Sequence, residues 1–314
     1  MLQVLGLVLP LFALIAIGYL AGRLAKLPIE GLAWLNFFII YIALPALIYQ
    51  LLARAPLADL PDASFLVRTT LGTFIVYVLS FALAYKFGPG RIKEATIMGY
   101  AGAYGNIGYL GPPLAIAAFG PEAGIPVALV FCLDNSLHFT MAPLLMAVGG
   151  ERPASPLRLF AGIIKKIFSH PFILATIAGI TAAWFSYQPP APVNQFLNTL
   201  SAAAAPCALF AMGVTAALRP LKRIPPDLAY LVPIKLLLHP LIVYLLLRGL
   251  PGLNDIWLYS AVLLATLPTA TNVFVLAQQY GVWEERASSA VVVSTLFSIV
   301  TVTAFLYAAQ NALL

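Results

Sequence analysis

Charged residues are scarce in this chain. Asp, Glu, Lys and Arg make up 9% of its 314 residues and apolar residues make up 62%, whereas a soluble domain contains about 25% charged residues. So few charges cannot cover the surface of a soluble protein of this length, which excludes that class. The long apolar runs instead predict an all-α polytopic membrane protein.

Cysteine, histidine and catalytic motifs are scarce as well. The two Cys both lie inside apolar runs, and three His are too few for a multi-histidine metal site. There is no His-Glu-x-x-His run, no Gly-x-Ser-x-Gly elbow and no Walker-type phosphate loop. We therefore expect neither an enzyme nor an ATP-driven pump, and no metal or cofactor.

Ten apolar runs are long enough to cross a bilayer as helices. They cover residues 3–22, 31–53, 66–87, 95–119, 123–147, 167–187, 195–218, 228–248, 255–280 and 286–309. Of the 17 Lys and Arg, only Arg54, Arg68 and Arg248 fall in connectors on one side of the membrane, and Lys235 falls inside a run. The positive-inside rule then places both termini outside the cytoplasm. The net charge of +6 is thus interpreted as topological, not as a nucleic-acid surface.

A weak internal repeat relates the two halves of the chain. A shift of 161 residues aligns three prolines and three glycines without a gap, namely Pro10 with Pro171, Pro28 with Pro189, Pro45 with Pro206, Gly18 with Gly179, Gly88 with Gly249 and Gly120 with Gly281. Because each copy holds five spans, an odd number, the second copy enters the membrane from the opposite side. The pattern predicts inverted five-helix repeats at 1–150 and 167–314, joined by a cytoplasmic connector at 151–166. Secondary transporters use this architecture for alternating access.

The fourth and ninth spans carry the strongest helix-breaking signals. These are Asn-Ile-Gly-Tyr-Leu-Gly-Pro-Pro at 106–113 and Leu-Pro-Thr-Ala-Thr-Asn at 267–272. Proline removes a backbone donor and clashes with the preceding turn, so we expect two half-helices in each span, whose freed N–H groups suit a carboxylate. Ordinary proline kinks are the alternative. Glycine recurs every third residue from 99 to 111, which favours a pliable segment over simple close packing.

Ionisable side chains interrupt two other spans. Asp134 lies near the middle of the fifth span, beside Asn135 and one turn before His138. A carboxylate at that depth is costly unless it has a function, so we interpret Asp134, with support from His138, as a group that carries a proton, or otherwise as a hydrogen-bonded contact between helices. Lys235 and His239 form a second pair one turn apart. They could give electrostatic support to an anion, or Lys235 could reach the headgroups.

With these motifs in view, the chain resembles the auxin efflux carrier family, which includes plant PIN-type auxin exporters and bacterial malonate-permease-like proteins. The resemblance rests on the two breaking motifs, on the Val-Phe-Val-Leu-Ala-Gln-Gln-Tyr-Gly run at 273–281, and on ten spans over the whole chain. It implies a scaffold of spans 1, 2, 6 and 7, a transport domain of spans 3–5 and 8–10, a crossing of spans 4 and 9 beside the substrate, and a homodimer.

The resemblance also implies a site. The residues expected to bind substrate are Asn106, Tyr109, Gly111, Asn135, Thr269, Thr271 and Asn272, and the residues expected to break the crossing helices are Pro112, Pro113 and Pro268. The predicted function is transport of a small organic anion, malonate-like or auxin-like, across a bacterial inner membrane by an elevator-type mechanism coupled to H⁺. The alternatives are Na⁺ coupling, as in bile-acid-type carriers, a uniporter, and a membrane receptor or sensor. Membrane lipid is an expected partner.

Overall fold

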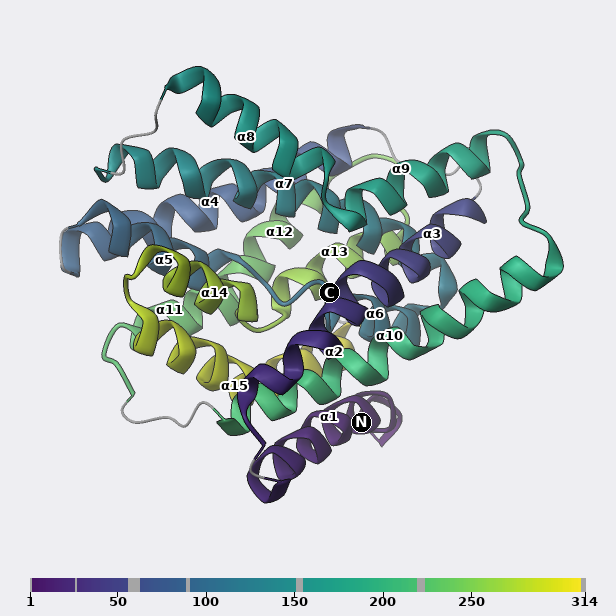
Figure 1. Cartoon of the computed structure of the whole chain (residues 1–314), viewed down its shortest axis with the longest axis horizontal. Helices are drawn as coiled ribbons and strands as arrows, with labels where there is room; N and C mark the ends of the chain where they lie inside the picture. The colour runs from purple at the N-terminus through teal and green to yellow at the C-terminus, as the bar shows by residue number, and fades with distance from the viewer. Residues whose placement is uncertain are drawn as a thin grey trace. The chain divides into compact units, whose positions relative to one another are not determined.

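The computed structural model describes residues 2–25, 27–55, 63–88, 91–150, 155–218 and 224–311 (Figure 1). Every regular element within these ranges is a helix, and extended backbone pairs there at a single isolated bridge. The predicted all-α fold is confirmed. Of the basic residues on which the topology prediction depends, Lys26, Arg152, Arg219, Lys222 and Arg223 lie outside the described residues, as does 151–154 of the predicted connector.

The helices follow one another with short connections. The α-helices are α1 (Leu2–Ala25), α2 (Leu32–Phe38), α3 (Leu44–Ala53), α4 (Ala63–Phe87), α5 (Ile92–Ala103), α6 (Gly111–Phe119), α7 (Gly124–Val148), α8 (Pro156–Phe168), α9 (Pro171–Trp184), α10 (Ala191–Leu218), α11 (Leu228–Pro233), α12 (His239–Leu247), α13 (Asp255–Thr266), α14 (Thr271–Tyr280) and α15 (Glu284–Gln310). Short 3₁₀ turns, η1 (Ile29–Gly31) and η4 (Pro121–Ala123), and wider π turns, η2 (Ile39–Ala43) and η5 (Ile234–Leu238), join some of them.

Six stretches of helix are long and apolar enough to cross a membrane. They are Leu32–Ala53, Ala63–Phe87, Pro121–Val148, Ala191–Leu218, Leu228–Leu247 and Glu284–Gln310, and α8 with α9 makes a seventh if the two form one broken span. The fourth and ninth predicted spans correspond to shorter helices. In particular, α5 has 12 residues and α13 has 12, too few for the ~20 that an unbroken span needs. The described residues thus contain six or seven candidate spans, and ten remains a prediction.

Proline explains the two π turns. Pro45 and Pro240 each stand at the second position of the α-helix that follows a π turn. Because proline has no N–H, it cannot complete the hydrogen bond to the preceding turn, and the widened turn absorbs the mismatch. The second π turn carries Lys235 and leads directly to His239. The backbone irregularity therefore sets the direction of the two ionisable side chains of this span.

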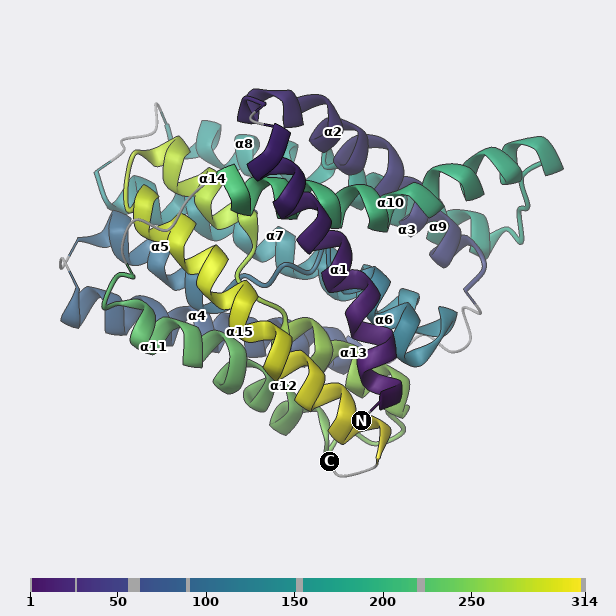
Figure 2. The same ribbon diagram turned by 90° about the horizontal axis from the view of Figure 1, so that it is seen from below.

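The described helices form two compact units. The first is drawn from Met1–Pro61, Ile107–Cys132 and Ser169–Pro220, and the second from Asp62–Asn106, Leu133–Phe168 and Leu221–Leu314. In the first unit α1 packs along α10, and α3 packs against α9 and α10. In the second unit α4 packs against α5 and α12, and α15 lies along α13 and α14 (Figure 2).

Small residues let the helices of each unit approach closely. In the first unit, a Cβ added to Gly213 of α10 would lie 2.0 Å from the carbonyl oxygen of Ile15 in α1. In the second unit, a Cβ added to Gly102 of α5 would lie 2.1 Å from Ser80 Oγ in α4. In a bilayer, where apolar surfaces gain little by leaving lipid, such close packing is what holds helices together.

Candidate functional site

Two unwound segments cross inside the second unit. Residues 104–106 follow α5, and residues 267–270 join α13 to α14. Gly105 pairs with Thr269 in an antiparallel bridge. The Asn106 N–H donates to the Pro268 carbonyl at 2.7 Å, and the Ala270 N–H donates to the Tyr104 carbonyl at 2.9 Å. The chain thus leaves the helical conformation at both predicted motifs, and each segment provides hydrogen-bond partners for the other.

Side chains satisfy the carbonyl groups that the break in α13 leaves open. In a continuous helix the Thr269 N–H would bond to the Ala265 carbonyl, but here it donates to Ser294 Oγ at 3.0 Å. Lys235 Nζ donates to that carbonyl instead, at 2.6 Å. A cation at this position also balances the partial negative charge of a helix C-terminus. Lys235 therefore caps α13, and its side chain is 0% exposed, which favours this role over contact with the headgroups.

The hydroxyl of Thr269 caps the other broken helix. Thr269 Oγ1 donates to the Ala101 carbonyl of α5 at 2.8 Å. In an unbroken α5 that carbonyl would accept from the N–H of Gly105, which instead lies in the crossing segment. Thr269, expected to bind substrate, thus has a structural partner for its hydroxyl hydrogen and keeps only acceptor capacity.

Four buried side chains form a hydrogen-bonded chain that starts at this cap. Lys235 Nζ lies 3.1 Å from His239 Nδ1. His239 Nε2 lies 3.3 Å from Thr73 Oγ1 of α4. Thr73 Oγ1 donates to Asp134 Oδ2 of α7 at 3.0 Å. The structure thus brings together Asp134, Lys235 and His239, which lie up to 105 positions apart in the sequence.

With Lys235 protonated and Asp134 ionised, the donors in this hydrogen-bonded chain have one consistent order. A hydroxyl has a single hydrogen, so Thr73, which donates to Asp134, must accept from His239 Nε2–H. His239 Nδ1 then accepts from the Lys235 ammonium. Every hydrogen bond therefore points from the cation to the carboxylate, and the two opposite charges compensate each other without direct contact. An unpaired charge at this depth would cost several kcal/mol.

Two buried polar atoms next to this chain have no partner within the described residues: Asp134 Oδ1 and His138 Nε2. His138 lies one turn after Asp134 on α7, and its Nδ1 is hydrogen-bonded to the Asp134 carbonyl. The Tyr104 ring stacks on the imidazole, with 4.0 Å between ring centroids. The carboxylate thus has one oxygen engaged and one open, so it has capacity to bind a proton.

A second chain of polar side chains joins the crossing to α7. Asn272 Nδ2, at the start of α14, donates to Tyr104 Oη at 3.1 Å. Tyr104 Oη donates to Asn135 Oδ1. Asn135 is buried whereas Asn272 is exposed, so the chain leads from the exterior of the unit to the residue adjacent to Asp134. Asn106 lies in the crossing itself and is buried.

The remaining predicted residues fall into two groups. Thr271 and Pro268 belong to the same unit, Thr271 as the first residue of α14 and Pro268 as a residue of the segment that follows α13. Tyr109, Gly111, Pro112 and Pro113 belong to the first unit. Because Pro112 and Pro113 have no N–H, the N-terminus of α6 offers fewer donors to an anion than the N-terminus of α14, which has no proline in its first turn.

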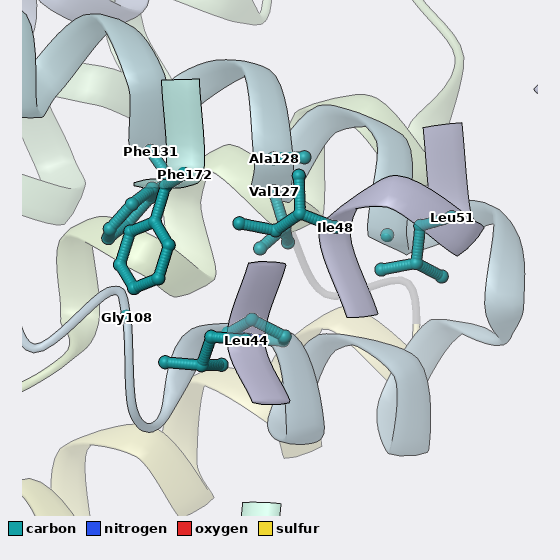
Figure 3. A pocket seen from close by; sticks show the side chains of 10 residues that line it. Leu44, Ile48, Leu51, Gly108, Val127, Ala128, Phe131 and Phe172 are labelled. Atoms are coloured by element: carbon teal, nitrogen blue, oxygen red, sulfur yellow. The ribbon is translucent and has the colours of Figure 1, made fainter. Parts of the chain in front are cut away.

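The first unit contains a small apolar cavity. Figure 3 shows it between Leu44, Ile48 and Leu51 on one side and Val127, Ala128, Phe131 and Phe172 on another, with Gly108 at its edge. Pro112 also lines it. Its volume is about 10 Å³, roughly one water-sized sphere, and an apolar cavity of that kind stays dry. It therefore has neither the donors nor the room for a carboxylate in this structure.

Three side chains of the site had not been identified from the sequence: Thr73, Tyr104 and Ser294. Tyr104 lies two residues before the Asn106 motif, so extending that motif could have found it. Thr73 and Ser294 lie in apolar runs with other hydroxyl residues, and no local pattern distinguishes them. Their roles depend on partners 61 and 25 positions away.

Known proteins match the chain along nearly its whole length. Residues 3–306 match the family described as "Membrane transport protein". A Rhizobium meliloti (strain 1021) protein named "Putative malonate transporter" is 52% identical over 307 residues, which cover 98% of this chain and 96% of that protein. An "Uncharacterized transporter" of Methanothermobacter thermautotrophicus is 30% identical over 303 residues, 94% of each chain. An "Uncharacterized transporter" of Escherichia coli (strain K12) is 25% identical over 317 residues, 98% of each chain.

Proposed function

The chain belongs to the auxin efflux carrier family of membrane transport proteins, and we propose that it is a proton-coupled secondary transporter of a small organic anion. The substrate class is a mono- or dicarboxylate. The name of the Rhizobium meliloti relative makes malonate the first candidate. Transport proceeds by elevator-type alternating access, in a homodimer embedded in the bacterial inner membrane.

The order of the helices supports two inverted five-helix repeats. The break between α5 and α6 is followed by the long helix α7, and the break between α13 and α14 is followed by the long helix α15. Gly111 and Thr271 begin the second half-helices, 160 positions apart, close to the 161-residue shift of the sequence repeat. These agreements favour the repeats at 1–150 and 167–314 with ten spans.

The compact units support part of the proposed division into scaffold and transport domain. The first unit contains spans 1, 2, 6 and 7, and the second contains spans 3 and 8–10. Spans 4 and 5 are divided between the two units, at residue 106 and at residue 132. We propose that the second unit, which holds the crossing and the ionisable chain, is the part that moves.

The observation that carries the coupling proposal is the hydrogen-bonded chain from Lys235 to Asp134. If one proton moves along each link, from Lys235 to His239, from His239 to Thr73 and from Thr73 to Asp134, both ends become neutral. The nitrogen and oxygen atoms keep their positions in the charged and in the neutral state, and only the hydrogens move. A proton taken up at Asp134 Oδ1, the oxygen without a described partner, would change the net charge of these four side chains. Proton coupling requires a group that takes up a proton when the site faces one side of the membrane and releases it when the site faces the other side.

The amide groups favour a carboxylate as substrate. Asn106, Asn135 and Asn272 supply neutral donors, and the first turn of α14 adds backbone N–H groups at the positive end of a helix dipole. Thr271 completes the proposed substrate residues of the second unit, and Tyr109 and Gly111, also predicted from the sequence, belong to the first unit. Na⁺ coupling is the alternative, because Asp134 Oδ1 has no described partner and the side-chain oxygens of Thr269 and Asn272 are not used by the hydrogen bonds that these residues donate.

We expect Asn272→Ala to weaken carboxylate binding by about one to two decades. The loss of a hydrogen bond to a charged group costs about 1.5–3 kcal/mol, and the change also removes the donor to Tyr104. Asn106→Ala should act in the same direction. The measurement is a titration of purified protein with malonate and other small carboxylates, followed by thermal shift. Gln278→Ala, which removes an exposed amide of the same helix, is the control. Unchanged affinity in both Asn variants would move the site elsewhere.

A flux assay tests the function itself. Protein reconstituted into liposomes should accumulate radiolabelled carboxylate when a pH gradient is imposed, without added Na⁺. Flux that responds to neither a pH gradient nor a Na⁺ gradient would indicate a uniporter. Binding without any flux would indicate a receptor or sensor.

The charge distribution predicts the orientation of the chain in the membrane. A cysteine at position 154 should be protected from a membrane-impermeant maleimide in intact cells, and a cysteine at position 314 should be labelled. The control is permeabilised cells, in which both should react. Labelling at 154 with protection at 314 would reverse the proposed topology.

A further inference from the structure

The helix α8 (Pro156–Phe168) presents three different faces. Its first face, Leu159, Ile163 and Ile167, is spaced by four and is buried or half-buried against the protein. A second stripe, at i, i+3, i+7 and i+11, consists of large apolar side chains that are exposed by 76%, 62%, 39% and 57%, namely Leu157, Phe160, Ile164 and Phe168. Figure 1 shows α8 above α7.

The third face is basic. Arg158 and Lys165, seven positions apart, lie two turns from each other on the same side of α8, and both are exposed. Lys166 is nearer the protein, since its Nζ lies 5.1 Å from the centre of the Phe139 ring in α7. No acidic residue occurs in α8. Its start is defined, because Ser155 Oγ accepts from the Arg158 N–H at 3.1 Å and so caps the helix.

We propose that α8 lies in the headgroup layer of the membrane, where Arg158 and Lys165 bind anionic phospholipid headgroups and the stripe from Leu157 to Phe168 enters the acyl-chain boundary. An apolar stripe bordered by basic side chains is the arrangement of an interfacial helix. Anionic lipid complements the charge of the basic face. This assigns to the protein a lipid-binding surface that is separate from the crossing segments and from the hydrogen-bonded side chains between Lys235 and Asp134.

A second copy of the chain fits this surface less well than anionic lipid. A symmetric contact through α8 would bring Arg158 and Lys165 of one copy near the same residues of the other copy, and α8 has no acid to compensate them. The exposed apolar stripe also distinguishes α8 from a helix that lies free in water, because four large apolar side chains in one row would then stay hydrated.

The experiment compares lipids on full-length protein. Purified protein in neutral detergent is given phosphatidylglycerol or phosphatidylcholine with the same acyl chains, and the apparent Tm is followed against lipid concentration. Phosphatidylglycerol should bind more tightly. Each basic residue near a membrane contributes about fivefold, so Arg158→Gln/Lys165→Gln should lower the apparent affinity for phosphatidylglycerol by about 25-fold. The matched control is Arg23→Gln/Lys86→Gln, which removes the same charge as two isolated exposed cations from two other helices and should lower the affinity less, because no pair of cations on one helix face is lost.

Three further arms separate the alternatives. Glycerol 3-phosphate, the soluble headgroup fragment, should not shift the Tm at the same concentrations, and an equal shift would replace lipid by a free phosphate ligand. In liposomes containing phosphatidylglycerol, a cysteine in place of Phe160 should resist a water-soluble maleimide that labels a cysteine in place of Lys165. Equal labelling would place the stripe in water, and a disulfide-linked dimer through position 160 would show that a second copy covers it. Either result overturns the proposal, as does an Arg158→Gln/Lys165→Gln variant that keeps its preference for phosphatidylglycerol.

Discussion

Asp134→Asn should abolish the accumulation of substrate that a pH gradient drives, while leaving substrate exchange within about twofold of the wild type. Asn can still accept the hydrogen bond from Thr73, so the geometry of the chain is kept. The Asn side chain cannot take up a proton, and so the charge at this position can no longer vary. The change therefore separates coupling from binding.

The measurement is uptake into liposomes with the pH gradient as the only driving force, beside counterflow with labelled substrate on one side. Asp255→Asn is the matched control, because Asp255 is an exposed carboxylate of the same unit and should leave both assays unchanged. If Asp134→Asn still accumulates substrate against its concentration gradient, another group carries the proton. If it loses counterflow as well, Asp134 is needed for binding or for the movement.

Lys235→Met should lower the free energy of unfolding by about 3–5 kcal/mol, the range seen when one partner of a buried charge pair is removed. Three groups lose their donor or compensating charge together. The Ala265 carbonyl loses its cap, His239 Nδ1 loses its hydrogen-bond donor, and the Asp134 carboxylate loses the only cation in its hydrogen-bonded chain. Equilibrium unfolding in mixed micelles measures the change. Lys86→Met, at an exposed lysine of α4, should stay within about 0.5 kcal/mol.

A double variant identifies the cause. In Lys235→Met/Asp134→Asn neither charge is left alone, so about 1–3 kcal/mol of the loss should return. A double variant whose loss equals the sum of the two single losses would mean that Lys235 and Asp134 do not compensate each other. The effect of Lys235→Met would then be due to the uncapped end of α13.

The breaks in the helices could be predicted from the sequence because proline acts locally. Pro268 and the pair at 112–113 remove N–H groups whatever surrounds them: α13 ends before Pro268, and the pair lies in the first turn of α6, directly after the break. Asp134, Lys235 and His239 could be selected as well, because a charge in an apolar run is conspicuous by itself. Their connection could not. It depends on Thr73, an unremarkable hydroxyl in α4, and on the π turn that sets the direction of Lys235.

The glycines spaced by three show where a local pattern misleads. The sequence favoured a pliable segment, but Gly99 and Gly102 lie within α5, where an added Cβ would meet the Tyr77 ring at 2.9 Å and Ser80 Oγ at 2.1 Å. These two positions serve close packing. Gly105 and Gly108 do lie in unwound backbone. Glycines with the same spacing thus have two structural roles, close packing against α4 and unwound backbone, and only the position of α4 shows which glycine has which role.

The bridge between Gly105 and Thr269 limits the insertions and deletions that the two crossing segments can accept. An insertion or deletion of a single codon within 104–106 would shift that strand-like segment against 268–270, and the donors of Asn106 and Ala270 would lose their acceptors at the same time. The two segments lie more than half of the sequence apart, but their lengths can therefore change only together. Indels are excluded from either one unless the other compensates, whereas the connectors between spans can vary in length at little cost.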